Sequence, residues 1–210
     1  IVLSFYANVY GQSFQKEFPK SIALKVSNAL AVARENVMIF VDLDQLKKAN
    51  SDFNAAAYIV LDGKNEIPSQ INLKDRDFPG MVFVLDKLEG MESREIVVRY
   101  NSTGSNKRTY TKRTQAELSY KTGGEWKNRE YIGGTFKNVE YLRVPPEHKD
   151  HSWFIRYEGP GWESDKVGYR FYLDQRNATD VFGKITSEMV LQNVGLDGFD
   201  SYHNIQPWGM

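Results

Sequence analysis

Short runs of alternating apolar and polar residues recur along almost the whole chain, and turn signals close most of them. Ile22, Leu24 and Val26 alternate with smaller or polar residues, and Asp62-Gly63 follows another apolar run as a tight-turn signal. Strands of this kind, with a turn about every 8–12 residues, are typical of sandwiches and barrels. The sequence therefore predicts an all-β fold, an antiparallel β-sandwich.

The expected strands leave little of the chain for helices. Pro68 favours an edge position for the run that contains it. Only residues 187–194 have a helical pattern, with Ser187 as N-cap, while residues 43–50 form a turn or a short helix. The NSTGSN loop at 101–106 is the best candidate for an internal boundary. The expected strands are Ile22–Val26, Asn36–Val41, Ala55–Leu61, Ile67–Leu73, Met81–Leu88, Arg94–Tyr100, Gln115–Tyr120, Arg129–Tyr131, Val139–Val144, Ser152–Glu158 and Val167–Asp174.

The two ends of the chain carry signals of their own. Residues 1–6 are mostly apolar and are followed by Val9-Tyr10-Gly11, so we interpret residues 1–11 as the remnant of a secretory signal peptide rather than as an ordinary first strand. Residues 12–210 then form the β-sandwich domain. The chain stops in the apolar stretch QPWGM, which predicts a domain truncated at its C-terminus. These features predict an exported protein, periplasmic or extracellular.

Charge and cysteine content narrow the classes of partner. Lys plus Arg and Asp plus Glu both total 27, so the formal net charge is zero, and nothing favours nucleic acid or an anionic membrane as partner. The chain has no cysteine, which excludes disulfides, thiolate catalysis and thiolate zinc sites within it. Beyond the first residues, no run approaches the roughly 18 apolar residues of a membrane span.

The stretch from Asp150 to Asn177 is rich in both aromatic and charged residues. If residues 152–158 and 167–174 pair as strands across a loop at 159–166, alternation gives them one apolar face, which we expect in the core. The loop between them carries Trp162 and Glu163. The opposite face would carry Arg156, Glu158, Arg170, Tyr172 and Asp174.

This charged face has two interpretations. One is a solvated sheet surface with cross-strand ion pairs, each worth less than about 1 kcal/mol. The other is a binding cleft, in which arginine forks hold a carboxylate and the rings of Trp162 and Tyr172 stack on a sugar. An acidic sugar, such as a uronate, would satisfy both kinds of side chain.

The histidines and acidic loops offer further candidates. His148 lies in PPEHKD, where a solvated loop residue is expected, whereas His151 and His203 lie in polar and aromatic sequence and are candidate bases. No HxH or HExxH spacing indicates a metal. The acidic loops also offer hard oxygen ligands that suit calcium, although they lack the spacing of an EF-hand. Those ligands would be Asp165, Asp197 and Asp200.

The segment RVPPEHKDHSWFIRYEGPGWESDKVGYRFYLDQRNATDVFGK, with MVLQNVGLDGFDSYH and PWGM after it, resembles an uncharacterised family of exported bacterial proteins classed as a domain of unknown function. Members of that family are commonly encoded beside genes for degradation of pectin, ulvan and related acidic polysaccharides. The resemblance covers roughly residues 20–210 and is densest from residue 140 onward. It implies similarity to the galactose-mutarotase-like β-supersandwich and a natural chain longer than this one.

Two functional hypotheses follow, and we favour the first, an enzyme. In a lyase acting on acidic polysaccharides, Arg156 or Arg170 would hold the uronate carboxylate while His151, His203 or Tyr202 acted as base. In a hydrolase the roles would fall to two carboxylates, Glu158 with Glu163 or Asp174. In a non-catalytic binding protein, Trp162 and Tyr172 would be stacking platforms. The candidate catalytic residues are His151, His203, Arg170 and Glu163, and the candidate substrate-binding residues are Arg156, Glu158, Trp162, Tyr172 and Asp174.

Overall fold

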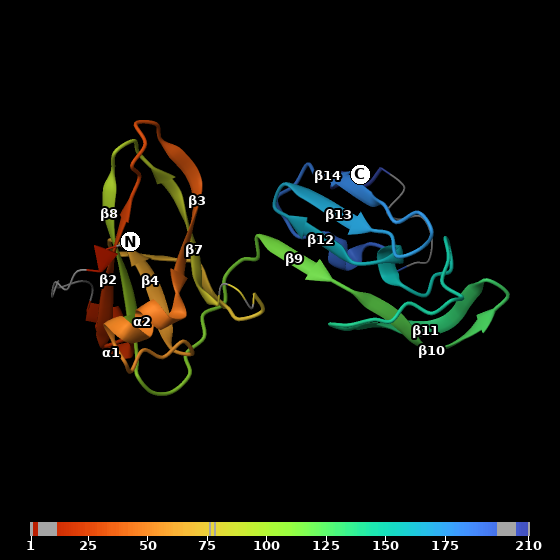
Figure 1. Ribbon diagram of the computed structural model, residues 1–210, viewed down its shortest axis with the longest axis horizontal. Coiled ribbons are helices and arrows are strands. Elements are labelled where there is room, and N and C mark those ends of the chain that lie inside the picture. Colours follow the sequence, from red (N-terminus) through yellow and green to blue (C-terminus); the bar gives the residue numbers. More distant parts are fainter. Residues whose placement is uncertain (1, 4–11, 76, 78, 197–204, 210) are drawn as a thin grey trace. The chain divides into compact units, whose positions relative to one another are not determined.

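The computed structural model describes residues 2–3, 12–75, 77, 79–196 and 205–209 (Figure 1). The fold is all-β with antiparallel sheets, as predicted, with 46% of residues in strands and 9% in helices. The chain divides into two compact units, residues 1–110 and 111–210, which we call unit 1 and unit 2. The NSTGSN loop lies within unit 1. No helix of the described residues is long and apolar enough to cross a membrane.

Unit 1 is a sandwich of two antiparallel sheets. The first has the strand order β1-β2-β8-β4-β5 and the second the order β3-β7-β6. The strands are β1 (Val2–Leu3), β2 (Lys20–Ser27), β3 (Arg34–Asp42), β4 (Tyr58–Asp62), β5 (Asn65–Ile67), β6 (Ser69–Asn72), β7 (Gly80–Leu88) and β8 (Ser93–Tyr100), with helices α1 (Gln12–Glu17) and α2 (Leu43–Ala49).

The core of unit 1 follows from strand alternation. Leu24 on β2, Phe83 on β7 and Val98 on β8 belong to one apolar cluster that fills the space between the sheets. The other face of the first sheet is covered near α1 by a second cluster that includes Phe18 and Ile59. The residues before and after Pro68 belong to different sheets, because β5 pairs with β4 and β6 pairs with β7.

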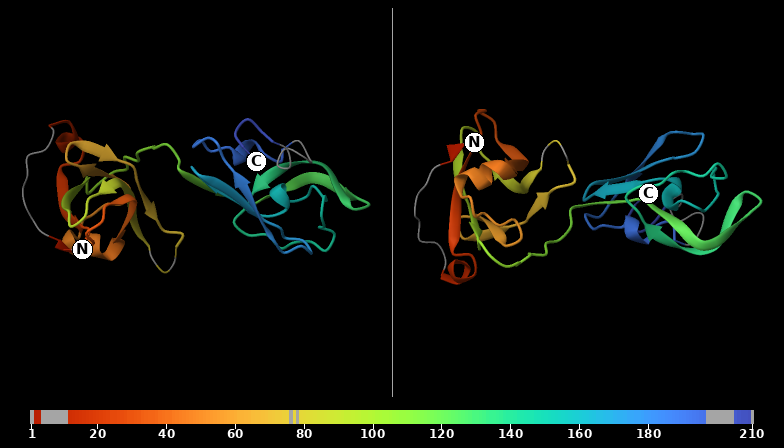
Figure 2. Two further views of the ribbon diagram at one scale, coloured as in Figure 1. Left: turned by 90° about the horizontal axis from the view of Figure 1, so that it is seen from above. Right: turned by 60° about the horizontal axis from the view of Figure 1, so that its bottom comes forward.

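Unit 2 contains a four-stranded antiparallel sheet in the order β14-β13-β12-β9 and a separate hairpin, β10-β11. A one-turn 3-10 helix, η1, contacts both β13 and β10, and Figure 2 shows the hairpin as a layer of its own within the unit. The elements are β9 (Thr114–Glu117), β10 (Ser119–Lys127), β11 (Glu130–Asn138), η1 (Arg156–Glu158), β12 (Gly161–Ser164), β13 (Val167–Phe171), β14 (Thr179–Gly183) and η2 (Leu191–Asn193).

Several of the strands predicted for unit 2 are not found in the structure. Residues 152–158 do not form a strand, because Trp153, Tyr157 and Glu158 have left-handed φ angles of 58–61° and the segment closes into η1. Strand β13 pairs instead with β12, which lies where a loop was expected, and with β14, which was not expected as a strand. Residues 139–144 form no strand either.

The helix expected at 187–194 is reduced to the single turn η2. Side chains from other elements form hydrogen bonds with the backbone of this segment. Glu163 accepts from the N–H groups of Val190 and Leu191. Arg156 donates to carbonyls that include that of Val194. With these partners supplied, the segment does not need helical hydrogen bonds.

Candidate functional site

The four-stranded sheet of unit 2 turns its charged face inward. Glu163 and Arg170 are buried, whereas Trp162 and Val181 are exposed, with Tyr169 between them in one row across the strands. The sequence predicted the opposite orientation, with the apolar face of β13 in the core. The prediction is wrong because the inward charges have partners inside: Arg170 pairs with Glu158 of η1, and Glu163 pairs with Lys184.

Arg170 is the centre of this buried charge network. Its Nη1 donates to Glu158 Oε2 at 3.1 Å, and its Nε and Nη2 donate to Asp180 Oδ2 at 3.0 and 2.8 Å. It also donates to the hydroxyl of Tyr172, and its guanidinium lies 4.3 Å from the centre of that ring. Arg170 is fully buried. We therefore assign it to positioning rather than to direct contact with a ligand.

Arg176, which sequence reasoning missed, joins three carboxylates. Its Nη1 lies 2.9 Å from Asp150 Oδ1, and its Nη2 donates to Glu158 Oε1 at 2.8 Å and to Asp174. Burial by itself would raise the pKa of Asp174, but hydrogen bonds from the side chain and backbone of Arg176 lower it overall. The hydrogen bond to Asp174 raises the pKa of Arg176. The sequence did offer one indication of this role: Arg176 follows Asp174 by two positions, close enough for its backbone and side chain to bond the same carboxylate.

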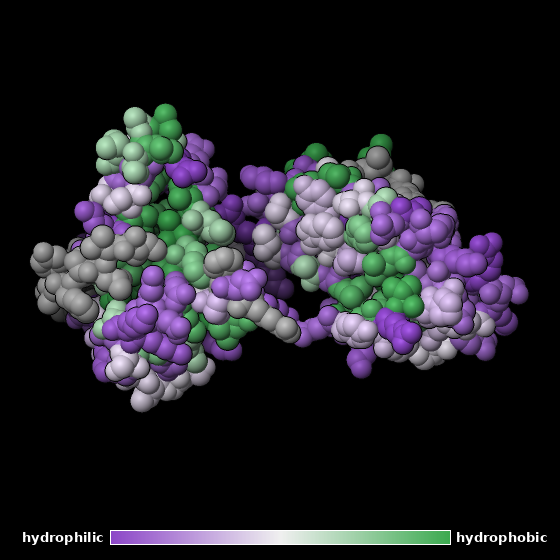
Figure 3. Space-filling model, in the orientation of Figure 1, coloured by the Kyte–Doolittle hydropathy of each residue, from purple (hydrophilic) through white to green (hydrophobic). Residues whose placement is uncertain are grey.

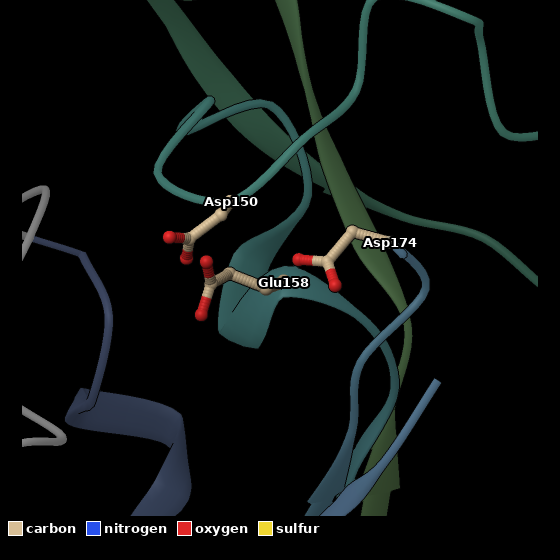
Figure 4. A group of neighbouring side chains, drawn as sticks. All are labelled: Asp150, Glu158 and Asp174. Carbon is tan, nitrogen blue, oxygen red and sulfur yellow. The ribbon is translucent and has the colours of Figure 1, made fainter. Parts of the chain in front are cut away.

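The three carboxylates held by Arg176 also form a candidate metal centre. Asp150, Glu158 and Asp174 each place one oxygen within 4.8 Å of the others, and Figure 4 shows their carboxylates turned toward one another. A cation there would have to compete with the Arg176 guanidinium for the same oxygens. Of the calcium ligands expected from sequence, Asp165 pairs with Arg113 at 2.9 Å. The other two, at 197 and 200, lie outside the described residues.

His151 and Asp150 form the part of the network that reaches solvent. His151 Nδ1 lies 3.0 Å from Asp150 Oδ2, and the two side chains are 40% and 38% exposed. The backbone N–H of His151 donates to Glu158 Oε1 at 3.0 Å. Because a carboxylate only accepts hydrogen bonds, the proton of the neutral ring lies on Nδ1 and the basic nitrogen is Nε2. The Nε2 atom itself is buried, although the rest of the side chain reaches solvent. The other candidate base, His203, and Tyr202 lie outside the described residues.

His148 is buried, not solvated as expected. Its Nδ1 lies 2.7 Å from Ser152 Oγ, and its Nε2 makes no hydrogen bond of acceptable geometry within the described part of the chain. Burial lowers the pKa of His148, although the Glu158 backbone and the charges of Asp174 and Glu158 act in the opposite direction. The polar sequence PPEHKD is typical of a solvated loop. Local polarity does not show which other segments pack over the histidine.

The backbone around the network is strained. Left-handed φ angles cost non-glycine residues about 1–2 kcal/mol each and persist only where the surroundings impose them. Such strain concentrates at functional sites, which marks this loop region as the candidate site. The residues concerned are His151, Trp153, Tyr157, Glu158 and Asn177.

A family model matches residues 26–210, which span both units. The chain belongs to the family described as Domain of unknown function (DUF4861). No curated protein and no solved structure matches the chain.

Two predicted site residues of this DUF4861 domain hold the segment 190–194 in place. Arg156 donates to the carbonyls of Val194, Leu191 and Gln192 and to Glu117. Buried Glu163 accepts from Lys184 Nζ at 2.5 Å as well as from two backbone N–H groups. Both residues have their polar groups directed at protein partners, so their geometry indicates a structural role.

The outer face of the sheet gives this DUF4861 domain an aromatic surface. Trp162, 36% exposed, stacks on Tyr169 with ring centres 5.6 Å apart and planes 19° from parallel. Tyr172, the other predicted platform, is buried beneath the guanidinium groups of Arg170 and Arg176. Figure 3 shows hydrophobic residues reaching the visible surface of unit 2 among hydrophilic ones.

Proposed function

We propose that this DUF4861 domain is an exported enzyme that acts on acidic polysaccharides or their oligosaccharides, with lyase chemistry centred on His151. The observation that carries the proposal is the His151–Asp150 pair, which lies at the solvent-exposed end of a network where histidines, carboxylates and arginines converge. A binding module needs no such convergence. The family resemblance described above, with its implied supersandwich fold and genomic neighbours, supports the same substrate class.

In this mechanism the substrate is a uronate within a chain. The His151 ring turns its buried Nε2 toward the substrate and takes the proton from the carbon next to the carboxylate. The electron pair forms a carbon–carbon double bond, and the glycosidic oxygen leaves and takes a proton from water. Asp150 fixes the imidazole, and Arg176 fixes Asp150. Of the three arginines, Arg176 is 29% exposed whereas Arg156 and Arg170 are buried, so Arg176 is the one that can approach the substrate carboxylate. To do so it would have to exchange one of its bonds to Asp150, Glu158 or Asp174.

A hydrolase is less well supported by the same geometry. It needs two carboxylates that can reach a glycosidic bond. Glu158 and Glu163 are buried and paired with cations, and Asp174 is held by Arg176. Because all three predicted carboxylates are held by cations, the geometry favours proton abstraction by His151 over hydrolysis.

The test is the ultraviolet absorbance of unsaturated uronate during incubation with pectate, ulvan or alginate, and with a neutral glycan as control. His151→Asn is the matched variant, because asparagine tolerates the left-handed backbone at this position. We expect one acidic substrate to give absorbance with the parent chain and none with His151→Asn, while thermal unfolding is unchanged. Full activity of the variant would remove His151 from the mechanism. Shortened chains without absorbance would establish hydrolysis instead.

The stacked pair Trp162 and Tyr169 favours a second candidate, a non-catalytic binding protein for acidic glycans. Aromatic faces suit the apolar face of a sugar ring. In that case Trp162→Ala would weaken binding of acidic oligosaccharides without loss of stability, and added salt would weaken binding by the parent chain. Equal binding of neutral and acidic oligosaccharides would count against this candidate.

A further inference from the structure

The hairpin β10-β11 of unit 2 bends sharply at its middle, where each strand carries two glycines. Gly124 pairs with Gly133 across the hairpin, and Gly123 and Gly134 are their neighbours in the sequence. Gly123, Gly133 and Gly134 have left-handed φ angles of 81°, 71° and 76°, which glycine adopts without steric cost. Figure 2 shows the hairpin bent along its length.

This bend has the properties of a hinge. A Cβ added at Gly123 or at Gly133 would meet no atom within 4 Å, so the backbone has open space around both positions. A hinge needs only a few residues that absorb a change of φ and ψ, and glycine changes conformation more freely than any other residue. The bend separates an inner half of the hairpin, residues 119–122 and 135–138, from an outer half, residues 125–132.

Each half of the hairpin holds the loop that carries the candidate base. In the outer half, the N–H of Tyr131 donates to the carbonyl of Ser152 at 2.8 Å. In the inner half, the N–H of Lys121 donates to the carbonyl of Phe154, also at 2.8 Å. The two carbonyls belong to the residues on either side of Trp153. A movement of the outer half would therefore free one side of Trp153 while the other side stays attached.

Trp153 lies beside the candidate base. Its ring centre is 5.3 Å from that of His151, and Nε2 of His151 is buried. The two residues have left-handed φ angles of 58° and 59°, a strained conformation that persists only while the surroundings impose it. The bond from Tyr131 to the loop is one of these restraints. Its loss would let Trp153 turn away and bring Nε2 to the surface.

Aromatic contacts hold the outer half closed. The ring centres of Trp126 and Tyr131 lie 5.2 and 5.0 Å from that of Phe154. In the inner half, Tyr120 packs on the same ring at 5.3 Å and its backbone also pairs with that of Ile155. The backbone of the inner half thus meets the loop at two successive residues. Because each aromatic pair contributes only modestly, the outer half is the part that opens more easily.

We propose that the outer half of the hairpin is a lid over His151, which opens at the glycine hinge and exposes Nε2. In the closed structure the basic nitrogen is buried, and proton abstraction requires it at the surface. The part of the lid in turnover of an acidic polysaccharide rests on the proposed function, whereas its opening does not.

The first experiment measures hydrogen exchange in the full chain by nuclear magnetic resonance. It compares the amides of Tyr131 and Lys121, which bond the same loop from opposite sides of the hinge. After correction for intrinsic rates, we expect the Tyr131 amide to exchange about tenfold faster or more, because a lid opens without unfolding the rest of unit 2. Equal protection of the two amides would overturn the lid.

Two matched variants test whether opening exposes the base. Trp126→Leu removes a contact of the lid with Phe154, and Tyr120→Leu removes the corresponding contact of the inner half. Diethyl pyrocarbonate modifies an unprotonated imidazole nitrogen, here Nε2 of His151, and peptide mass spectrometry gives the rate. We expect Trp126→Leu to raise this rate about threefold or more and Tyr120→Leu to leave it unchanged. Thermal unfolding checks that both variants are folded.

Equal rates of His151 modification in the two variants would contradict the hinge. Turnover of an acidic glycan that depends on His151, with the Tyr131 amide as protected as that of Lys121, would overturn only the lid. Opening of the lid without turnover of any acidic glycan would overturn the proposed enzyme and leave the lid standing.

Discussion

Nη1 of Arg170 lies 3.1 Å from Oε2 of Glu158, and the two side chains are 0% and 2% exposed. Ions removed from water in this way are tolerated only when each is paired and hydrogen-bonded. Here Glu158 is also bonded by Arg176 and by the backbone of His151. The pair therefore links η1, β13 and the loop that carries the candidate base.

Replacing Glu158 by alanine should destabilise unit 2 by about 1–3 kcal/mol, because Nη1 of Arg170 would lose its buried acceptor while Asp180 still pairs with the guanidinium. Chemical unfolding followed by far-ultraviolet circular dichroism measures the change. A double variant, Glu158→Gln with Arg170→Met, removes both charges and should lose less than the single alanine variant. A loss below about 1 kcal/mol for Glu158→Ala would mean that the pair is not buried in solution.

His148 should make the stability of unit 2 depend on pH near neutrality. Its pKa is lower in the folded chain than the ordinary value of 6.5, so the unfolded chain binds more protons as the pH falls through that value. The free energy of unfolding should therefore decrease from pH 7 toward pH 5. His148→Gln should flatten this dependence. Parallel stability curves for the parent and the variant across this window would contradict the assignment.

Gly159→Ala should destabilise unit 2 by about 2 kcal/mol or more, because an added Cβ would lie 1.7 Å from the carbonyl oxygen of Phe171. Gly168→Ala is the control, since its Cβ would meet its nearest neighbour, in Phe182, at an ordinary 3.4 Å. Thermal melting of the two variants compares the positions directly. Similar melting temperatures would show that the chain around Gly159 can move aside at little cost.

Arg156→Lys should loosen the segment from 190 to 194 even though the charge is kept. A lysine cannot reproduce the planar fork that bonds the carbonyls of Leu191, Gln192 and Val194. Hydrogen exchange at the backbone of Val190 and Leu191 should rise, while exchange in the strands of unit 1 stays the same. Unchanged protection of these two amides would show that Glu163 alone holds the segment.

The sequence was a good guide to unit 1. There the period of two in Ile22, Leu24 and Val26 identifies the strand, and all three residues belong to the core. Pro68 marks the point where one sheet ends its pairing and the other begins. In such a sandwich the apolar face is the buried face, so the alternating pattern predicts both where a strand lies and which of its faces points into the core.

In unit 2 the same pattern was insufficient. Alternation in β13 correctly separated Tyr169 from Arg170, but it does not say which of them faces inward. That choice depends on Glu158 and Asp180, which reach Arg170 from other elements. The burial of His148 likewise depends on contacts between segments that are distant in the sequence, and local polarity does not predict such contacts.

The contrast between the two interiors has a calorimetric consequence. Unfolding unit 1 exposes a large apolar core, which raises the heat capacity of the unfolded chain, whereas exposing polar and charged groups lowers it. The apolar cluster of unit 2 is small, with Tyr157, Phe182, Leu191 and Val194 at its centre, and the charged residues Arg156, Glu158, Glu163 and Arg170 are also buried in this unit. The stability of unit 1 should therefore curve strongly with temperature and weaken on cooling, while that of unit 2 should change more nearly in a straight line.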